Sequence, residues 1–194
     1  MAPRVLAEAR LPPIVSYSDP ADPQLTLSWT LLDSAHPVTV GLTTASVPSF
    51  FPLVNCLHIQ EADTGETVGL PTVDVNGSTA PPLRLVPEQK ERFVTLHPGV
   101  PHVWSVSFRP FGHEVFTPER IKAMGSKRYR LLRLGMQLLR IGRRYTIRVR
   151  DGLTIDAWME GDLEDLIRGS EWKPRWDDPI YVTSAEAVEF CVEE

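Results

Sequence analysis

Apolar and polar residues alternate along several short stretches of this chain. The clearest stretch is 25–31, where Leu25, Leu27, Trp29 and Leu31 are separated by hydroxyl residues. A β-strand with one face in a core and the other in water produces this period of two. The same pattern predicts strands at 38–42, 56–60, 92–96, 102–109, 145–149 and 188–192, with a shorter one at Leu83–Leu85. The sequence therefore predicts a mainly β fold of about eight short strands in an antiparallel β-sandwich.

Turn residues separate these stretches. Pro98-Gly99 has the residue order of a type II turn. Asp151-Gly152 is a hairpin dipeptide. It predicts that 145–149 pairs with a second alternating stretch at 155–159, in which Trp158 lies on the polar side.

Two helical segments interrupt the strands. Thr117-Pro118-Glu119 has the residues of a helix start and predicts a partly helical insertion near 117–141. Asp162 is a suitable N-cap for a short helix near 162–168, which Gly169 ends.

The composition suits one domain. The chain has 194 residues, of which 42% are hydrophobic and 23% charged, as in ordinary globular proteins. Its 18 prolines favour short segments over long helices. We expect residues 1–24 to form an extended N-terminal lead-in and residues 25–194 a single β-sandwich domain with an insertion at 110–138.

One motif points to a fold family. Tyr145 opens an alternating strand, with Leu139 six residues and Gly142 three residues before it. This spacing resembles the tyrosine corner of immunoglobulin-like and fibronectin type III domains. The resemblance covers about eleven residues and implies that the Tyr145 hydroxyl bonds back to the preceding backbone. The chain as a whole is more distantly similar to small fungal proteins, a likeness that carries no activity.

The charge is unevenly distributed. The formal net charge is −5, but residues 1–119 carry −6, residues 120–150 carry +11 with no acidic residue, and residues 151–194 carry −10. The basic segment, which includes Arg143 and Arg144, is a candidate surface for nucleic acid or an acidic partner. The alternative is that it lies against the acidic C-terminal third and is neutralised internally, which the negative total favours.

Tryptophans form a second candidate surface. Trp158, Trp172 and Trp176 occur within 19 residues, in a loop-rich part of the chain. Large aromatic side chains dominate many binding interfaces. The alternative is that this loop folds back and covers an open edge of the sandwich.

Motifs for familiar chemistries are missing. The sequence contains no GxSxG, HExxH, CxxC or glycine-rich phosphate loop, so we expect no catalytic residue, metal site or cofactor. The two cysteines and the lack of an apolar leader or membrane-length segment favour a soluble cytoplasmic protein.

Three hypotheses about function follow. The first is a noncatalytic binding protein whose partner is an unknown protein or small ligand, with Arg143, Arg144, Trp158, Trp172 and Trp176 as candidate contacts. The second is a cofactor-independent enzyme of small-molecule metabolism, of the cyclase or isomerase type, because such enzymes can lack readable motifs. The third is binding of nucleic acid or an acidic partner through 120–150. The sequence does not indicate an oligomeric state.

Overall fold

The computed structural model describes residues 3–16, 23–42, 56–68, 84–108, 139–169, 173–175 and 177–194. The strands are β1 (Arg4–Arg10), β2 (Ile14–Ser16), β3 (Gln24–Leu32), β4 (Val38–Gly41), β5 (Leu57–Glu61), β6 (Phe93–Leu96), β7 (Pro101–Ser107), β8 (Arg144–Val149), β9 (Thr154–Ile155), β10 (Trp158–Glu160), β11 (Ile180–Ser184) and β12 (Val188–Glu193). The helices are the 3₁₀ helix η1 (Pro87–Arg92) and the α-helix α4 (Leu163–Gly169). The predicted insertion at 110–138, and nearly all of the helical segment near 117–141, lie outside these residues.

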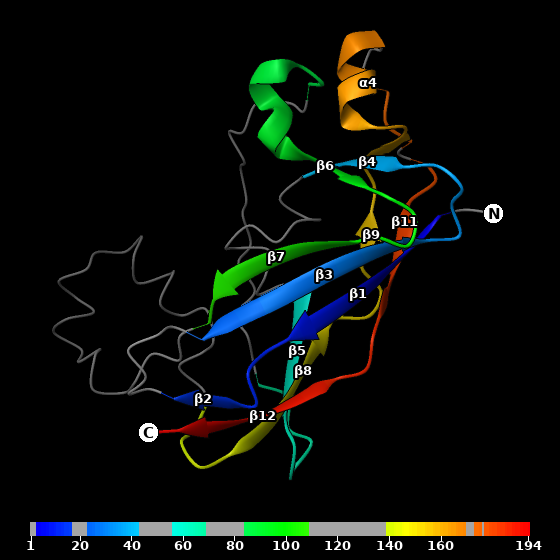
Figure 1. The fold of residues 1–194 in the computed structure, drawn as a ribbon. Helices are drawn as coiled ribbons and strands as arrows, with labels where there is room; N and C mark the ends of the chain where they lie inside the picture. The colour runs from blue at the N-terminus through cyan, green and yellow to red at the C-terminus, as the bar shows by residue number, and fades with distance from the viewer. Residues whose placement is uncertain are drawn as a thin grey trace, which may run out of the picture.

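The strands form three sheets, shown in Figure 1. Sheet A has the order β7-β3-β1-β11-β9, sheet B has the order β2-β12-β8-β5, and sheet C has the order β10-β4-β6. All neighbours are antiparallel except the pairs β1–β11 and β2–β12. The predicted mainly β, sandwich-like architecture is confirmed.

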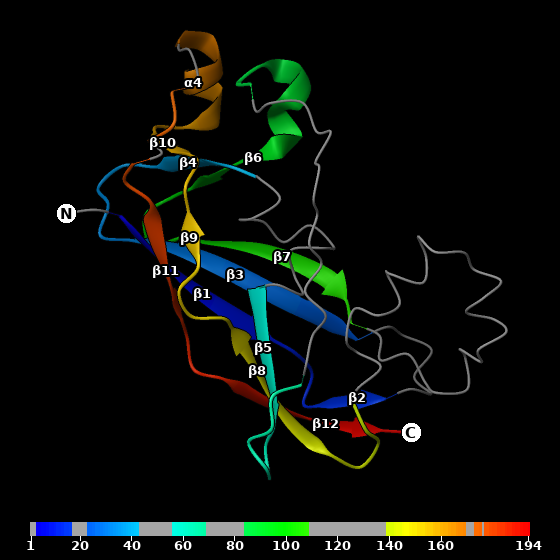
Figure 2. The ribbon, with the colours of Figure 1, turned by 180° about the vertical axis from the view of Figure 1, so that it is seen from behind.

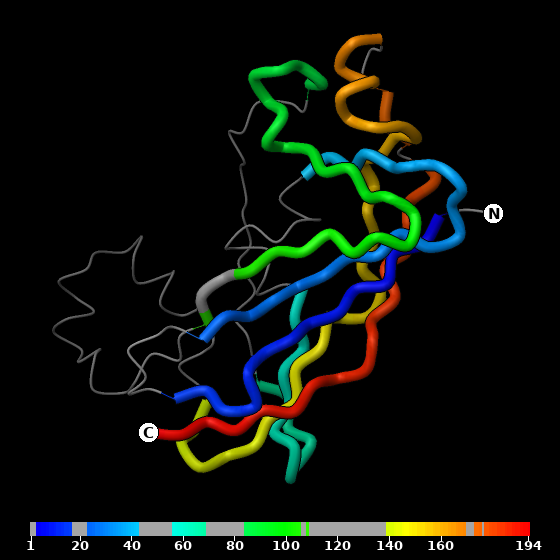
Figure 3. The backbone as a smooth tube through the Cα atoms, viewed as in Figure 1, coloured from blue at the N-terminus to red at the C-terminus, as the bar shows by residue number. Residues whose placement is uncertain are grey.

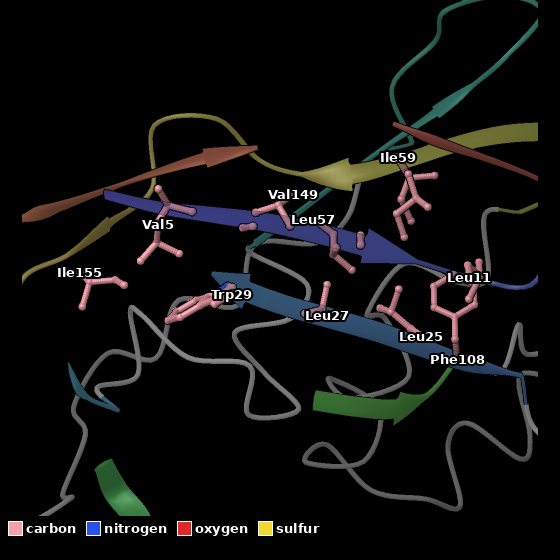
Figure 4. Packing of buried hydrophobic residues seen from close by; sticks show 14 of the residues in the cluster. Val5, Leu11, Leu25, Leu27, Trp29, Leu57, Ile59, Phe108, Val149 and Ile155 are labelled. Atoms are coloured by element: carbon pink, nitrogen blue, oxygen red, sulfur yellow. The ribbon is translucent and has the colours of Figure 1, made fainter. Parts of the chain in front are cut away.

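The core lies between sheets A and B. The view from behind shows β5 and β8 crossing β1 and β3, and β1 contacts β8 (Figure 2). Alternate side chains of β1, β5 and β8 are buried, as the period of two requires. Leu25, Leu27 and Trp29 of β3 face Leu57 and Ile59 of β5 across it (Figure 4). All five are at most 4% exposed, so the predicted inward positions of β3 and the predicted strand at 56–60 are confirmed.

The N-terminal segment takes part in two sheets. We expected an extended lead-in, but β1 lies between β3 and β11 in the middle of sheet A, and β2 extends sheet B. Its partner on both sheets is the C-terminal segment, which runs parallel beside it in Figure 3. Arg4 pairs with Tyr181 and Ser16 with Glu193, the same offset of 177 residues. The two segments therefore bend together from sheet A into sheet B.

The predicted hairpin after Asp151-Gly152 is wrong. Gly152 makes a turn with φ +78°, but β8 pairs with β5 and β12. The stretch 155–159 is broken between β9 and β10, and these pair with β11 and β4. The break shifts the alternation by one residue, so Ala157 and Trp158 are both buried.

Sheet C carries a second small core. Leu163 and Leu166 of α4 pack with Leu85 and Phe93 against this sheet. The predicted short helix is confirmed, and the Glu164 N–H donates to Asp162 Oδ1 over 3.0 Å as an N-cap should. The predicted strand at Leu83–Leu85 is wrong for its described part, because Leu85 lies outside any strand.

Candidate functional site

Arg143 and Arg144 lie where the chain enters β8. Gly142 turns the chain with φ +79°, a conformation that side-chain-bearing residues rarely adopt. The turn is fastened to β12, because the Gly142 N–H donates to the Val192 carbonyl over 2.7 Å and the Val192 N–H donates to the Arg143 carbonyl over 3.0 Å. Both arginines are thus held at one end of sheet B.

Arg144 bridges two acidic side chains. Its Nη2 lies 2.5 Å from Asp63 Oδ1, and its Nη1 lies 3.2 Å from Glu189 Oε1. The hydrogen bond to Asp63, with the charges of both acids, raises the pKa of Arg144 above its ordinary value. The guanidinium therefore already has two anionic partners, one after β5 and one on β12.

Arg143 and Arg148 also pair with acids. Arg143 Nε lies 3.5 Å from Glu61 Oε1, and the Glu61 side chain is only 11% exposed. The other Glu61 carboxylate oxygen accepts a hydrogen bond from the Thr64 hydroxyl over 3.2 Å. Arg148 Nη1 lies 2.5 Å from Asp151 Oδ2. We call Glu61, Asp63, Arg143, Arg144 and Glu189 the β8 charge cluster.

This pairing bears on both interpretations of the basic segment. Within the described residues, Glu189 and Asp151 belong to the acidic C-terminal third, whereas Glu61 and Asp63 come from β5 and the turn after it. Partner acids therefore come from both sides of the basic segment in the sequence. The pairs are about half exposed, so each contributes little to stability alone. Residues 120–138 lie outside the described residues.

Trp158 is a core residue. It is 2% exposed, and its indole N–H donates to the Asp178 carbonyl over 2.7 Å. The Arg175 guanidinium lies 5.0 Å from the ring centroid, within the range of a cation–π contact. The Arg175 N–H also donates to the Trp158 carbonyl over 3.0 Å. The chain around Asp178 and Arg175 thus folds over Trp158, and its ring is not on the surface.

The structure does not bring the candidate residues into one site. Arg143 and Arg144 belong to the start of β8 in sheet B, and Trp158 belongs to β10 in sheet C. Trp172 and Trp176 lie outside the described residues.

Two other groups have shifted acidities. Burial raises the pKa of the Cys56 thiol to about 11, so the thiol stays protonated at neutral pH and is a poor nucleophile. Burial lowers the pKa of His102, whose ring lies 4.4 Å from that of Trp104. In the described ranges, no group of three or more His, Cys, Asp and Glu side chains is arranged to hold a metal ion. No helix there has the length and apolar character needed to cross a membrane.

Sequence reasoning missed the acidic half of the β8 charge cluster. No sequence pattern singled out Glu61, Asp63 or Glu189. Pairing of β8 with both β5 and β12 brings these residues to the arginines. Strand order of this kind is not encoded in any local pattern.

Comparison of the chain with protein-family models, with curated proteins and with solved structures finds no match in any of the three. Its architecture and contacts therefore provide the basis for a functional proposal.

Proposed function

We propose that this protein is a noncatalytic binding protein built on an immunoglobulin-like sandwich. The strand order supports the topology. In immunoglobulin-like domains one sheet carries strands A, B and E side by side and the other carries C, F and G. Here β1, β3 and β7 are adjacent in sheet A, and β5, β8 and β12 are adjacent in sheet B, in the matching chain order.

The tyrosine at the start of β8 supports the same assignment. In this topology β8 is strand F, and the tyrosine corner belongs at its start. The hydroxyl of Tyr145 accepts a hydrogen bond from the Arg140 N–H over 2.8 Å. The Tyr145 side chain is 2% exposed and stacks on Phe190 with ring centroids 5.7 Å apart. The hydroxyl therefore fastens the turn before β8 to the core.

The observation that carries the functional proposal is the origin of sheet C. Its strand β4 follows β3 in the B–C connection, β10 lies in the F–G connection, and β6 leads into strand E. The B–C and F–G connections form the ligand-binding end of antibody variable domains. In this chain they are hydrogen-bonded into one sheet, with α4 packed on it and η1 leading directly into β6. We call sheet C with α4 and η1 the platform.

Internal contacts make the platform a fixed surface. Thr39 is fully buried, and its hydroxyl donates to the Gly161 carbonyl over 2.8 Å. Thr95 Oγ1 accepts the N–H of Leu163, the first residue of α4, over 3.0 Å. Lys90 of η1 forms an ion pair with Glu164 of α4. Binding residues on a rigid scaffold lose little conformational entropy on binding.

The outer surface of the platform is rich in acids. Its exposed acidic side chains Glu88, Glu91, Glu160, Glu164 and Asp165 outnumber its exposed bases, Lys90 and Arg168, which pair with Glu164 and Asp165. A partner with basic side chains would be attracted to this surface, and the net charge of −5 on the chain would attract it as well. We therefore propose a protein or peptide with a basic segment as the ligand class.

A random-sequence peptide library displayed on phage tests the proposal. We expect enrichment of basic peptides that bind the protein saturably and lose affinity about tenfold for the double variant E160K/D165K. The matched control is E66K/E193K, which changes the net charge equally at exposed positions outside the platform. Peptides that bind both variants alike, or a library that yields no saturable binder, would contradict the proposal.

A further inference from the structure

Sheet A ends at β7, and this edge is open along the described chain. β7 pairs with β3 from Gln24–Ser107 to Thr30–Pro101. Among the described residues it has no strand on its other side, so it is the edge strand of a five-stranded sheet. An edge strand offers a row of hydrogen-bonding groups to any other extended chain.

The hydrogen-bond phase of β7 identifies the outward groups. Hydrogen-bonded residues alternate along an antiparallel ladder. The Phe108 N–H donates to the Pro23 carbonyl over 2.7 Å, which fixes the phase of the alternation. His102 and Trp104 therefore exchange hydrogen bonds with β3. The N–H and C=O groups of Val103 and Ser105 point away from the sheet.

Within the part of the chain that the structure describes, this edge lacks the usual protection against pairing. Natural edge strands commonly carry charged side chains or are covered by other elements. Residues 101–107 contain no charged side chain, although 23% of the chain is charged. Val103 on the strand is 53% exposed, and Val100 beside it is 56% exposed. Pro101 removes an outward N–H only at the beginning of the strand.

We propose that β7 is a homodimer interface, in which two copies of this chain pair antiparallel through their β7 edges. Antiparallel pairing of identical strands has twofold symmetry, so the same edge can serve both copies. The register that places Val103 opposite Ser105 of the partner subunit gives each outward N–H of these residues a carbonyl acceptor. The two copies would then share one ten-stranded sheet.

The side chains near the proposed axis fit this arrangement. In that register the two copies of Trp104 lie opposite each other on the inner face of the joined sheet. Trp104 is half-buried and packs edge-on against Trp29 with ring centroids 5.1 Å apart. Cross-strand aromatic pairs stabilise antiparallel strands. Since the edge is uncharged, the net charge of −5 on each copy does not place like charges in direct contact there.

Sedimentation velocity over a wide concentration range tests the dimer. We expect the full chain to sediment at twice its mass of 21.8 kDa. Val103→Lys puts a charge on the exposed face of the edge, and Ser105→Pro removes an outward N–H. Each should raise the dissociation constant at least about tenfold. Circular dichroism and the thermal midpoint confirm that the variants are folded.

Two controls separate the edge from other surfaces. Ser105→Thr keeps the outward N–H and should remain dimeric. Tyr181→Lys alters a residue of β11 in the same sheet that is 60% exposed but lies away from the edge. It should remain dimeric as well. The proposal is overturned if the wild-type chain is monomeric at all concentrations, even if this monomer binds unrelated extended peptides. It is also overturned if folded V103K and S105P stay dimeric.

Discussion

The hydroxyl of Tyr145 accepts a hydrogen bond from the N–H of Arg140, five residues earlier, over 2.8 Å. This bond fastens the turn before β8 to a side chain that is almost completely buried. It is the contact that the motif Leu139, Gly142 and Tyr145 implied from the sequence.

Tyr145→Phe therefore removes an acceptor and leaves the Arg140 N–H without its partner in a partly buried place. An unsatisfied group of this kind costs about 1–3 kcal/mol. We expect urea unfolding to give a free energy of unfolding lower by that amount, with an unchanged m-value. Tyr181→Phe, at a side chain that is 60% exposed, is the matched control and should change little. Equal stability of Y145F and Y181F would show that the bond contributes nothing.

Thr39→Val tests how α4 is held on sheet C. The single Thr39 hydroxyl proton is donated to the Gly161 carbonyl, so across the 3.1 Å contact Thr95 donates to Thr39. Valine has the same shape but leaves both partners unsatisfied, which costs about 1–3 kcal/mol. We expect lower stability and faster amide hydrogen exchange in α4. The control Thr26→Val, on the outer face of β3, should leave amide hydrogen exchange in α4 unchanged. If the amides of α4 exchanged in T39V as slowly as in the wild type, the Thr39 hydroxyl would not hold α4 on sheet C.

Arg143→Glu together with Arg144→Glu tests the β8 charge cluster. The two new carboxylates would face Glu61, Asp63 and Glu189, so repulsion replaces attraction. We expect a lower urea midpoint than in the wild type. The difference between the two urea midpoints should narrow at high salt, because all of these groups except Glu61 are about half exposed and ions screen them.

The matched control for this pair is R84E/R140E, which makes the same change of charge at exposed arginines with no ion pair in the described residues. Its stability should stay close to that of the wild type. If R143E/R144E were as stable as this control and lost affinity for duplex DNA, the arginines would form an exposed nucleic-acid patch instead.

The two cysteines should differ in reactivity toward a thiol reagent at pH 8. With a pKa of about 11, roughly one Cys56 in a thousand is a thiolate at that pH, and burial also hinders attack. Cys191 is only partly buried and should react first. We expect one fast thiol in the native protein and two in urea, with Cys191→Ser removing the fast one. Rapid labelling of native C191S would contradict this assignment.

The raised pKa of Cys56 also affects how the stability of the protein depends on pH. A thiol whose pKa is raised by folding supports the folded state fully below its unfolded pKa of 9.0. That contribution is lost as the pH rises toward 11. Cys56→Ala should therefore flatten the decline in stability over this alkaline range.

Some elements were predictable because their signal is local. β3 alternates apolar and hydroxyl residues from Leu25 to Leu31, and α4 has a cap residue and two inward leucines at the right spacing. The N-terminal strand was overlooked because its inward positions are partly small, with Ala7 and Ala9 beside Val5. Such residues give little hydrophobic contrast with their neighbours. Trp158 was placed on the wrong face because the break between β9 and β10 reverses the alternation.

The partners of the candidate site could not be predicted for a different reason. Arg144 meets Asp63 and Glu189 only through the order β12-β8-β5, which joins segments far apart in the sequence. The tyrosine motif suggested a topology for one corner but not which acids would surround it. Charge totals by segment likewise showed an imbalance without showing which residues compensate it.

The parallel pairing of β1 with β11 and of β2 with β12 has a consequence for biosynthesis. β1 pairs with β11, and β2 pairs with β12; in both pairs the partner residues are 177 positions apart in the sequence. Closing so long a loop is entropically costly and makes folding slow. During synthesis β1 can pair with β3 on one side, but its other side stays unpaired until β11 has been made, and β2 stays unpaired until β12 has been made. Completion of sheets A and B must then be one of the last steps on the way to the native protein.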